Sequence, residues 1–181
     1  MFQPAFLSNC LLMGKRIKQL EPPDSIHLNA AEGWLELGNQ VEAFEELEQI
    51  TPQLRVHPDV LEIRWQIYAK EKKWDACVDI AQAITKLDPS RLFGWIHLSF
   101  ALHEQEKTQK AWDNLAGVAQ KFPDEHLIPY NLACYACQLG SLKEAWQWLE
   151  KAFALGDSKR LKLMALDDPD LEPMWKEIGK I

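Results

Sequence analysis

Small side chains recur along this chain at a fixed interval of 34 residues. The column comprises Ala43, Cys77, Ala111 and Ala145. Two further columns, which end at Leu149 and Ala152, are apolar at every step of 34 without a gap. Such a period is the signature of stacked units that bury their apolar faces against their neighbours. The interval therefore predicts an elongated array rather than a single rounded core.

Each repeat has the pattern of two helices joined by a short break. Apolar residues recur at steps of three and four, which is the spacing of one helix face. The repeats span 24–57, 58–91, 92–125 and 126–159, with breaks at 38–39, 71–73, 106–107 and 140–141. They close near Pro52, Pro89, Pro123 and Gly156. Proline cannot continue a helix and glycine readily ends one, so each repeat is predicted to be a helical hairpin.

A helix–turn–helix unit of 34 residues with these features resembles the tetratricopeptide repeat (TPR). The stretches AEGWLELGNQVEAFEELEQI and YNLACYACQLGSLKEAWQWLEKAFAL carry the resemblance most clearly. Gly38 and Gly140 lie between the helices, and Ala43 and Ala145 follow five residues later. The middle repeats depart from the pattern at four positions: Arg64 and Trp65, where apolar and small residues are usual, and Lys72 and Glu106, where glycine is usual.

The resemblance implies an all-α fold, a right-handed α-solenoid of about four hairpins over residues 24–159, with extra or capping helices at both ends. Residues 160–181 are predicted to form a C-terminal capping segment whose final helix runs from about Leu171 to Ile178. Residues 1–23 form an apolar tail or helix. The tail could cap the first repeat, lie in the groove of the solenoid, or mediate self-association with a second copy.

Composition excludes several classes of function. A formal net charge of −7 argues against a nucleic-acid footprint and against docking on an anionic membrane. Four cysteines in 181 residues are too few for a secreted disulfide scaffold. The N-terminal stretch lacks the basic start and the cleavage site of a signal peptide. We therefore predict a cytoplasmic protein that binds neither nucleic acid nor membrane.

No catalytic motif is present in the sequence. A phosphate-binding glycine loop, a nucleophile elbow and a zinc-binding helix with paired histidines are all missing. The acidic residues mostly recur at solvent-facing helical positions. We therefore expect no catalytic residue, no cofactor and no metal, and we predict that the protein is not an enzyme.

One alternative rests on the C-x-x-C pair formed by Cys134 and Cys137. His103 lies 34 residues before Cys137, so the two occupy equivalent places in adjacent repeats. Together with Cys134 they could make a thiol-dependent or metal-dependent site, although a closed zinc site needs four ligands. The pair also lies midway along a predicted helix, whereas redox pairs of this spacing usually sit at a helix N-terminus.

In the TPR family the first helices of the repeats line a concave groove that binds peptides or helices. Groove positions here change from acidic in the first repeat to apolar and aromatic in the third and fourth. The predicted partner-binding residues are Gln66, Phe93, Ile96, Phe100, His103, Tyr130, Cys134 and Cys137. Exposed aromatic side chains of this kind mark protein-binding surfaces. Alternatively, Phe93 and Phe100 are ordinary packing between repeats.

The sequence thus favours a non-catalytic scaffold or adaptor whose partner is a peptide, a helix or a filament subunit. Short, gap-free TPR chains also resemble the group called bacterial kinesin light chain, which accompanies bacterial tubulins. That resemblance implies a tubulin-associated accessory role as the more specific expectation.

Overall fold

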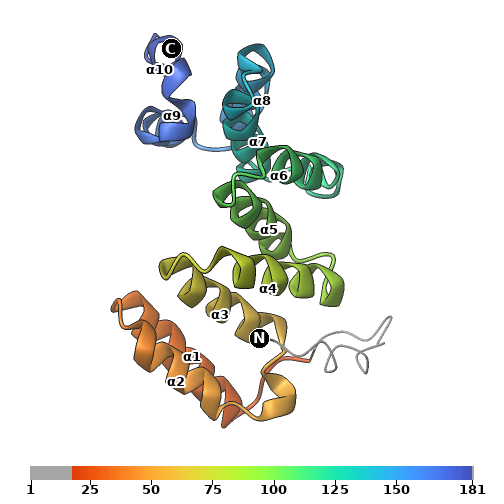
Figure 1. Cartoon of the computed structure of the whole chain (residues 1–181), viewed down its shortest axis with the longest axis vertical. Coiled ribbons are helices and arrows are strands. Elements are labelled where there is room, and N and C mark those ends of the chain that lie inside the picture. The colour runs from red at the N-terminus through yellow and green to blue at the C-terminus, as the bar shows by residue number, and fades with distance from the viewer. Residues whose placement is uncertain (1–17, 181) are drawn as a thin grey trace.

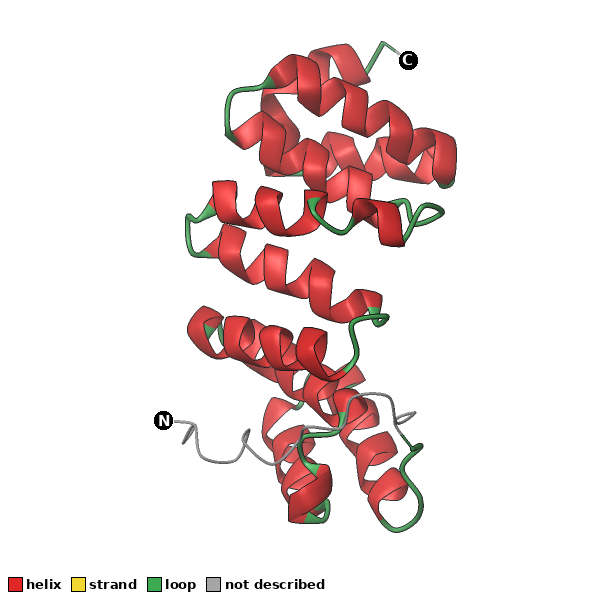
Figure 2. Cartoon of the chain, turned by 90° about the vertical axis from the view of Figure 1, so that its right-hand side faces the viewer, coloured by secondary structure: helices red, strands yellow, loops and turns green. Residues whose placement is uncertain are grey.

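The structure is a computed structural model that describes residues 18–180. Residues 1–17, which make up most of the predicted apolar tail, lie outside this range, and so do the interactions predicted for them. From Lys18 onward the chain is helical apart from short connections, as Figure 2 shows in red and green.

The helices follow one another as hairpins stacked along the long axis of the molecule (Figure 1). The hairpins are α1 (Asp24–Glu36) with α2 (Gln40–Gln49), α3 (Pro58–Lys70) with α4 (Trp74–Leu87), α5 (Leu92–Glu104) with α6 (Thr108–Ala116), and α7 (Leu127–Gln138) with α8 (Leu142–Leu155). Short 3-10 turns, η2 (Pro52–Leu54) and η3 (Ala119–Lys121), lie in two of the connections. This arrangement confirms the predicted all-α solenoid of four hairpins.

All four turns inside the hairpins contain a residue with a left-handed backbone. Gly38 and Gly140 adopt φ angles of 77° and 81°, which glycine reaches without steric cost. Lys72 and Glu106 hold the same place in the middle hairpins, at 54° and 61°. Side chains with a Cβ are strained in this region. The fold therefore demands this backbone whether or not the sequence supplies glycine.

The repeated small and apolar columns form the contacts between helices. Every member of the small column is fully buried, at 0% exposure. Close approach of two helices requires small side chains at the crossing point. Larger apolar residues then form three clusters along the stack rather than one central core. Each hairpin is stabilised by its neighbours, as expected for a solenoid.

A C-terminal segment closes the far end of the stack. It comprises α9 (Ser158–Asp167), η4 (Pro169–Met174) and α10 (Trp175–Ile178). Leu171, Met174 and Ile178 are buried against the fourth hairpin, and polar residues face outward. The prediction of a final helix from about Leu171 to Ile178 is partly wrong. This segment begins as a 3-10 helix at Pro169, and only its residues 175–178 are α-helical.

Among residues 18–180, none of the helices combines the length and the apolar character needed to cross a bilayer.

Candidate protein-binding face

An aromatic cluster lies where the second hairpin meets the third. Its members are Trp65, Trp74, Phe93, His97 and Phe100, which we call the central aromatic cluster. The rings of Phe93 and His97 stack with centroids 3.6 Å apart. Trp65 meets Phe93, His97 and Phe100 edge-on at 5.8, 4.4 and 6.2 Å, and Trp74 meets Phe100 at 5.8 Å. Edge-to-face contacts at these distances add to the stability that burial provides.

Trp65 occupies a position that is small in the other three hairpins. Its equivalents, one or two periods away, are Ala31, Ser99 and Ala133, all with 0% exposure. The indole of Trp65 therefore extends out of the second hairpin toward α5 and forms the buried base of the cluster. Its Nε1 is buried and has no hydrogen-bond partner among residues 18–180.

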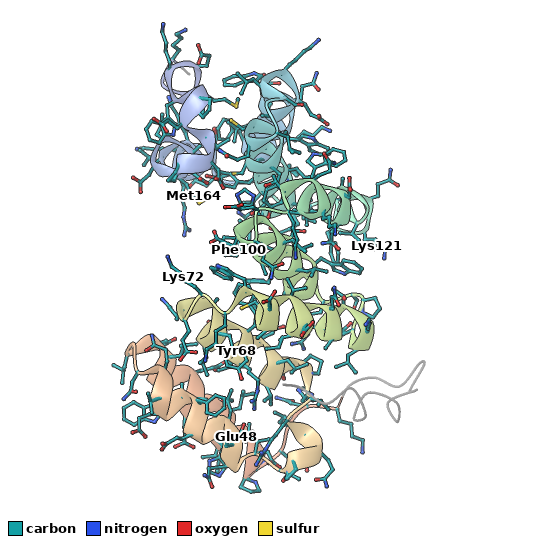
Figure 3. All side chains as sticks on the ribbon, viewed as in Figure 1. Glu48, Tyr68, Lys72, Phe100, Lys121 and Met164 are labelled. Carbon is teal, nitrogen blue, oxygen red and sulfur yellow. The ribbon has the colours of Figure 1, made fainter. Side chains whose placement is uncertain are left out.

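Phe100 is the exposed member of the cluster. One side of its ring packs on Trp65 and Trp74, while 37% of the residue remains open to solvent. In Figure 3 Phe100 lies on the left-hand side of the stack with Lys72 and Met164, and Lys121 lies on the opposite side. An apolar ring held by other rings needs little ordering when it binds a partner, which favours an anchoring role.

The cluster also fixes the charge state of its histidine. Burial lowers the pKa of His97 to about 4, so this ring is neutral at physiological pH. Its Nδ1 donates a hydrogen bond to the carbonyl of Phe93 at 2.9 Å. The face is therefore apolar and uncharged at its centre.

Ionic groups border the cluster at the start of α3. Arg91 donates to Asp59 Oδ1 at 2.6 Å and to Glu62 Oε1 at 2.7 Å, and so ties the third hairpin to the second. Burial raises the pKa of Glu62 above its usual value, while the nearby arginine opposes that shift. On α1 the exposed residues Glu32 and Glu36 add further acidic groups. The apolar centre is therefore continued by an acidic border.

The fourth hairpin does not present an open groove. Tyr130, Cys134 and Cys137 were predicted to face a partner, but they are buried, each at 5% exposure or less. The C-terminal segment covers this part of α7. Asp168 Oδ2 accepts a hydrogen bond from the Tyr130 hydroxyl at 2.9 Å and from the Cys134 thiol at 3.5 Å. These three side chains are thus unavailable as contact surface in this structure.

His103 and Gln138 bind the same C-terminal segment. The Nε2 atom of His103 lies 3.0 Å from Asp170 Oδ2, and Gln138 donates to the Asp170 carbonyl at 2.9 Å. The hydrogen bond to Asp170 raises the pKa of His103, although burial opposes the shift. His103 therefore joins the third hairpin to the capping segment rather than pointing into an open groove.

The two cysteines of the C-x-x-C pair are free thiols. Burial raises the pKa of Cys134 well above its usual value and raises that of Cys137, so both are held protonated and unreactive. Sulfur and carboxylate oxygens of Cys134, Asp168 and Asp170 lie within 4.8 Å of one another. Hydrogen bonds within the cap account for this grouping, so the thiol or metal alternative is not favoured.

Three other predicted contact residues lie on α3 and α5, the first helices of the middle hairpins, and are partly buried. Phe93 and Ile96 pack against neighbouring hairpins, which agrees with the alternative that Phe93 contributes to packing between repeats. Gln66 is partly exposed on α3. The sequence did not identify Trp65 and Trp74 as part of the face. Trp65 could have been found, because it breaks the small column, whereas no signal in the sequence places Trp74 beside Phe100.

The hairpin stack has the fold of a TPR solenoid. No family model matches the chain. The crystal structure of MamA superposes with a TM-score of 0.67 at 14% identity, covering 76% of this chain and 81% of that protein. A thermophilic TPR protein of Thermus thermophilus also gives a TM-score of 0.67, at 16% identity, covering 86% of this chain and 83% of that one.

The chain also matches part of a longer curated protein. The chain is 24% identical over 154 residues to the peroxisomal targeting signal receptor of Candida glabrata. The match covers 85% of this chain but only 23% of the receptor. The chain therefore spans about a quarter of the length of that relative.

Proposed function

We propose that this protein is a non-catalytic interaction module or adaptor that holds a protein partner against the concave side of its second and third hairpins. The partner contributes a peptide or helical segment with an apolar side chain that packs on Phe100. The likeness to TPR proteins supports this class of function, because TPR solenoids serve as protein-binding scaffolds. A cytoplasmic location fits the same proposal.

One observation carries the proposal: an exposed phenylalanine is backed by a rigid aromatic cluster. Large apolar residues on a protein surface are usually scattered, and a lone exposed ring carries little meaning. Phe100 differs because buried Trp65 and partly buried Trp74 hold it from two sides. Pre-ordered aromatic anchors of this kind dominate the energy of many interfaces.

The test compares affinity capture by the wild type with capture by Phe100→Glu. A partner that uses this face is expected to bind the variant at least about 30-fold more weakly, which corresponds to loss of one interface hot spot. The matched control is Leu163→Glu, because Leu163 is 63% exposed on α9 and is not a member of the central aromatic cluster.

Partners lost with Phe100→Glu and kept with Leu163→Glu would support the face. If both variants retain a partner equally, the partner binds to another surface and the proposed face is wrong. Circular dichroism must show the same helical content in both variants, so that unfolding does not imitate the loss of a partner.

A tubulin-associated role of the bacterial kinesin light chain type is a narrower form of the same proposal. It rests on the resemblance of the sequence alone. Co-sedimentation with assembled bacterial tubulin tests it, and absence of Phe100-dependent pelleting would remove this candidate while leaving the general adaptor role.

A further inference from the structure

The first hairpin has an apolar surface that faces away from the rest of the stack. We define this end face as Ile26 and Trp34 of α1, Leu37 directly after that helix, and Val41 at the start of α2. Exposure of these residues is 61%, 37%, 77% and 67%. The opposite side of α1, with Leu28, Ala31 and Leu35, is buried. The end face therefore lies on the side of α1 opposite its buried residues.

Two positions of this face, those of Ile26 and Trp34, are covered in the later hairpins, whereas those of Leu37 and Val41 become the exposed residues Glu71 and Asp75 in the second hairpin. One period after Ile26 is Val60, at 0% exposure, and three periods after it is Ile128, at 1%. The position of Trp34 becomes Tyr68, whose ring lies 6.5 Å from Phe44 on α2. In the second hairpin the covering element is thus the second helix of the preceding hairpin. The period of the fold therefore indicates that the part of the end face around Ile26 and Trp34 can accept one more such helix.

Acidic residues outnumber basic residues in the hairpin that carries this surface. Residues 24–57 contain one arginine, Arg55, and seven acidic residues: Asp24, Glu32, Glu36, Glu42, Glu45, Glu46 and Glu48. Glu36 and Glu42 are exposed on the two helices that carry the end face. An element that covers this face must therefore combine apolar side chains with positive charge.

We propose that the end face is the docking surface for residues 1–17 of the same chain. Those residues include Phe2, Phe6, Leu7, Leu11, Leu12 and Met13. They also include Lys15 and Arg16 and contain no acidic residue. This composition is complementary to an apolar face with an acidic border. One period before α2 lie residues 6–15, the place that a preceding second helix would hold.

Residues 1–17 are attached to the chain close to the first hairpin, so they can reach the end face. His57 Nε2 lies 2.9 Å from the carbonyl of Lys18, and Leu20 is buried against the first and second hairpins. Residues 18–23 then lead directly into α1. Seventeen residues reach up to roughly 55 Å when extended, whereas a 13-residue helix such as α1 is only about 20 Å long. The segment can therefore cover the whole end face while it stays tethered to that hairpin, which raises its effective concentration.

A second copy of the protein is a weaker candidate for this surface. Two-fold pairing would place one acidic hairpin against another, and like charges across an interface oppose association. A segment in the same chain meets no such repulsion and loses less freedom on docking.

Site-specific photocrosslinking of the full chain tests the assignment. A photoreactive benzoylphenylalanine is placed at Trp34, and an identical probe at Gln82, which is exposed on α4, serves as the matched control. The expected result is a crosslink within one chain, mapped by mass spectrometry to residues 1–17, in yield at least about fivefold above the control. The double variant Leu7→Glu/Leu11→Glu should abolish it without changing the helical content.

Crosslinks between two chains would overturn the assignment in favour of self-association. A yield no higher than the control would also overturn it, because the end face would then be open. This outcome is independent of the adaptor role, which Phe100→Glu tests on a different surface.

Discussion

The first and fourth hairpins follow the repeat pattern closely, whereas the second and third replace several of its residues. In the outer hairpins the turns contain glycine and the helix-crossing positions hold alanine. In the middle hairpins a lysine and a glutamate occupy the turns, and Trp65 and Arg64 replace small and apolar side chains. All four hairpins nevertheless form the same unit.

This difference separates two roles of residues in the solenoid. The columns that stay small or apolar in every hairpin, such as the one through Ala43 and Ala145, set the distance between helices. The exceptions build local features: Trp65 supports Phe100, and Arg64 pairs with Glu48 at 2.8 Å while lying over the ring of Phe44. Departures from the pattern are thus where this chain differs from a generic repeat array, and its best candidate face lies among them.

The largest expected effect comes from replacing Trp65 by the small residue that the other hairpins have at this position. Trp65→Ala gives the second hairpin the small residue of the others, yet it leaves a cavity beneath Phe100. We expect a loss of about 3–5 kcal/mol in the free energy of unfolding, measured by urea denaturation. Trp65→Phe should lose much less, because it keeps an aromatic ring and removes an N–H group that has no partner among residues 18–180. Full stability of Trp65→Ala would contradict the supporting role.

The neutral ring of His97, which lies between the middle hairpins, predicts that the stability of the protein depends on pH. The unfolded chain binds a proton at His97 near pH 6.5, whereas the folded chain does so only near 4. The unfolded state therefore binds more protons between these values, and stability falls by up to about 3 kcal/mol as the pH drops from 7 to 4. The difference in stability between wild type and His97→Leu, measured across this range, isolates the effect from the carboxylates. An unchanged difference would mean that His97 is not buried as a neutral ring.

Substitutions in the turns should have the smallest effects on stability. These effects should differ in sign between the middle hairpins and the outer hairpins. Lys72→Gly and Glu106→Gly relieve a strained backbone and should each add roughly 0.5–1 kcal/mol to stability. Gly38→Ala and Gly140→Ala should each lose about 1 kcal/mol, solely through the backbone, because an added Cβ at either position meets no atom within 4 Å. Thermal unfolding measures all four. Equal effects in both groups would show that the left-handed turns are not required.

Local and periodic signals predicted the fold well. The small column, the turn positions and the closing prolines depend on residues close in sequence or one period apart, so hairpin number and helix order could be derived from them. The candidate site depends on contacts between residues that are not related by the 34-residue repeat. His103 meets Asp170 across 67 residues. The helical spacing correctly placed Tyr130 and Cys134 on the first helix of the fourth hairpin, but it could not show that the capping segment folds back over them.

The central aromatic cluster has a consequence for spectroscopy. Indole fluorescence responds to the polarity around the ring and to nearby protonated imidazole groups. Trp74 is partly exposed beside Phe100, and Trp65 is buried 4.4 Å from the ring of His97. A partner seated on Phe100 changes the environment of the Trp74 indole. The proposed face therefore carries an optical reporter of its own, one of the eight tryptophans of the chain.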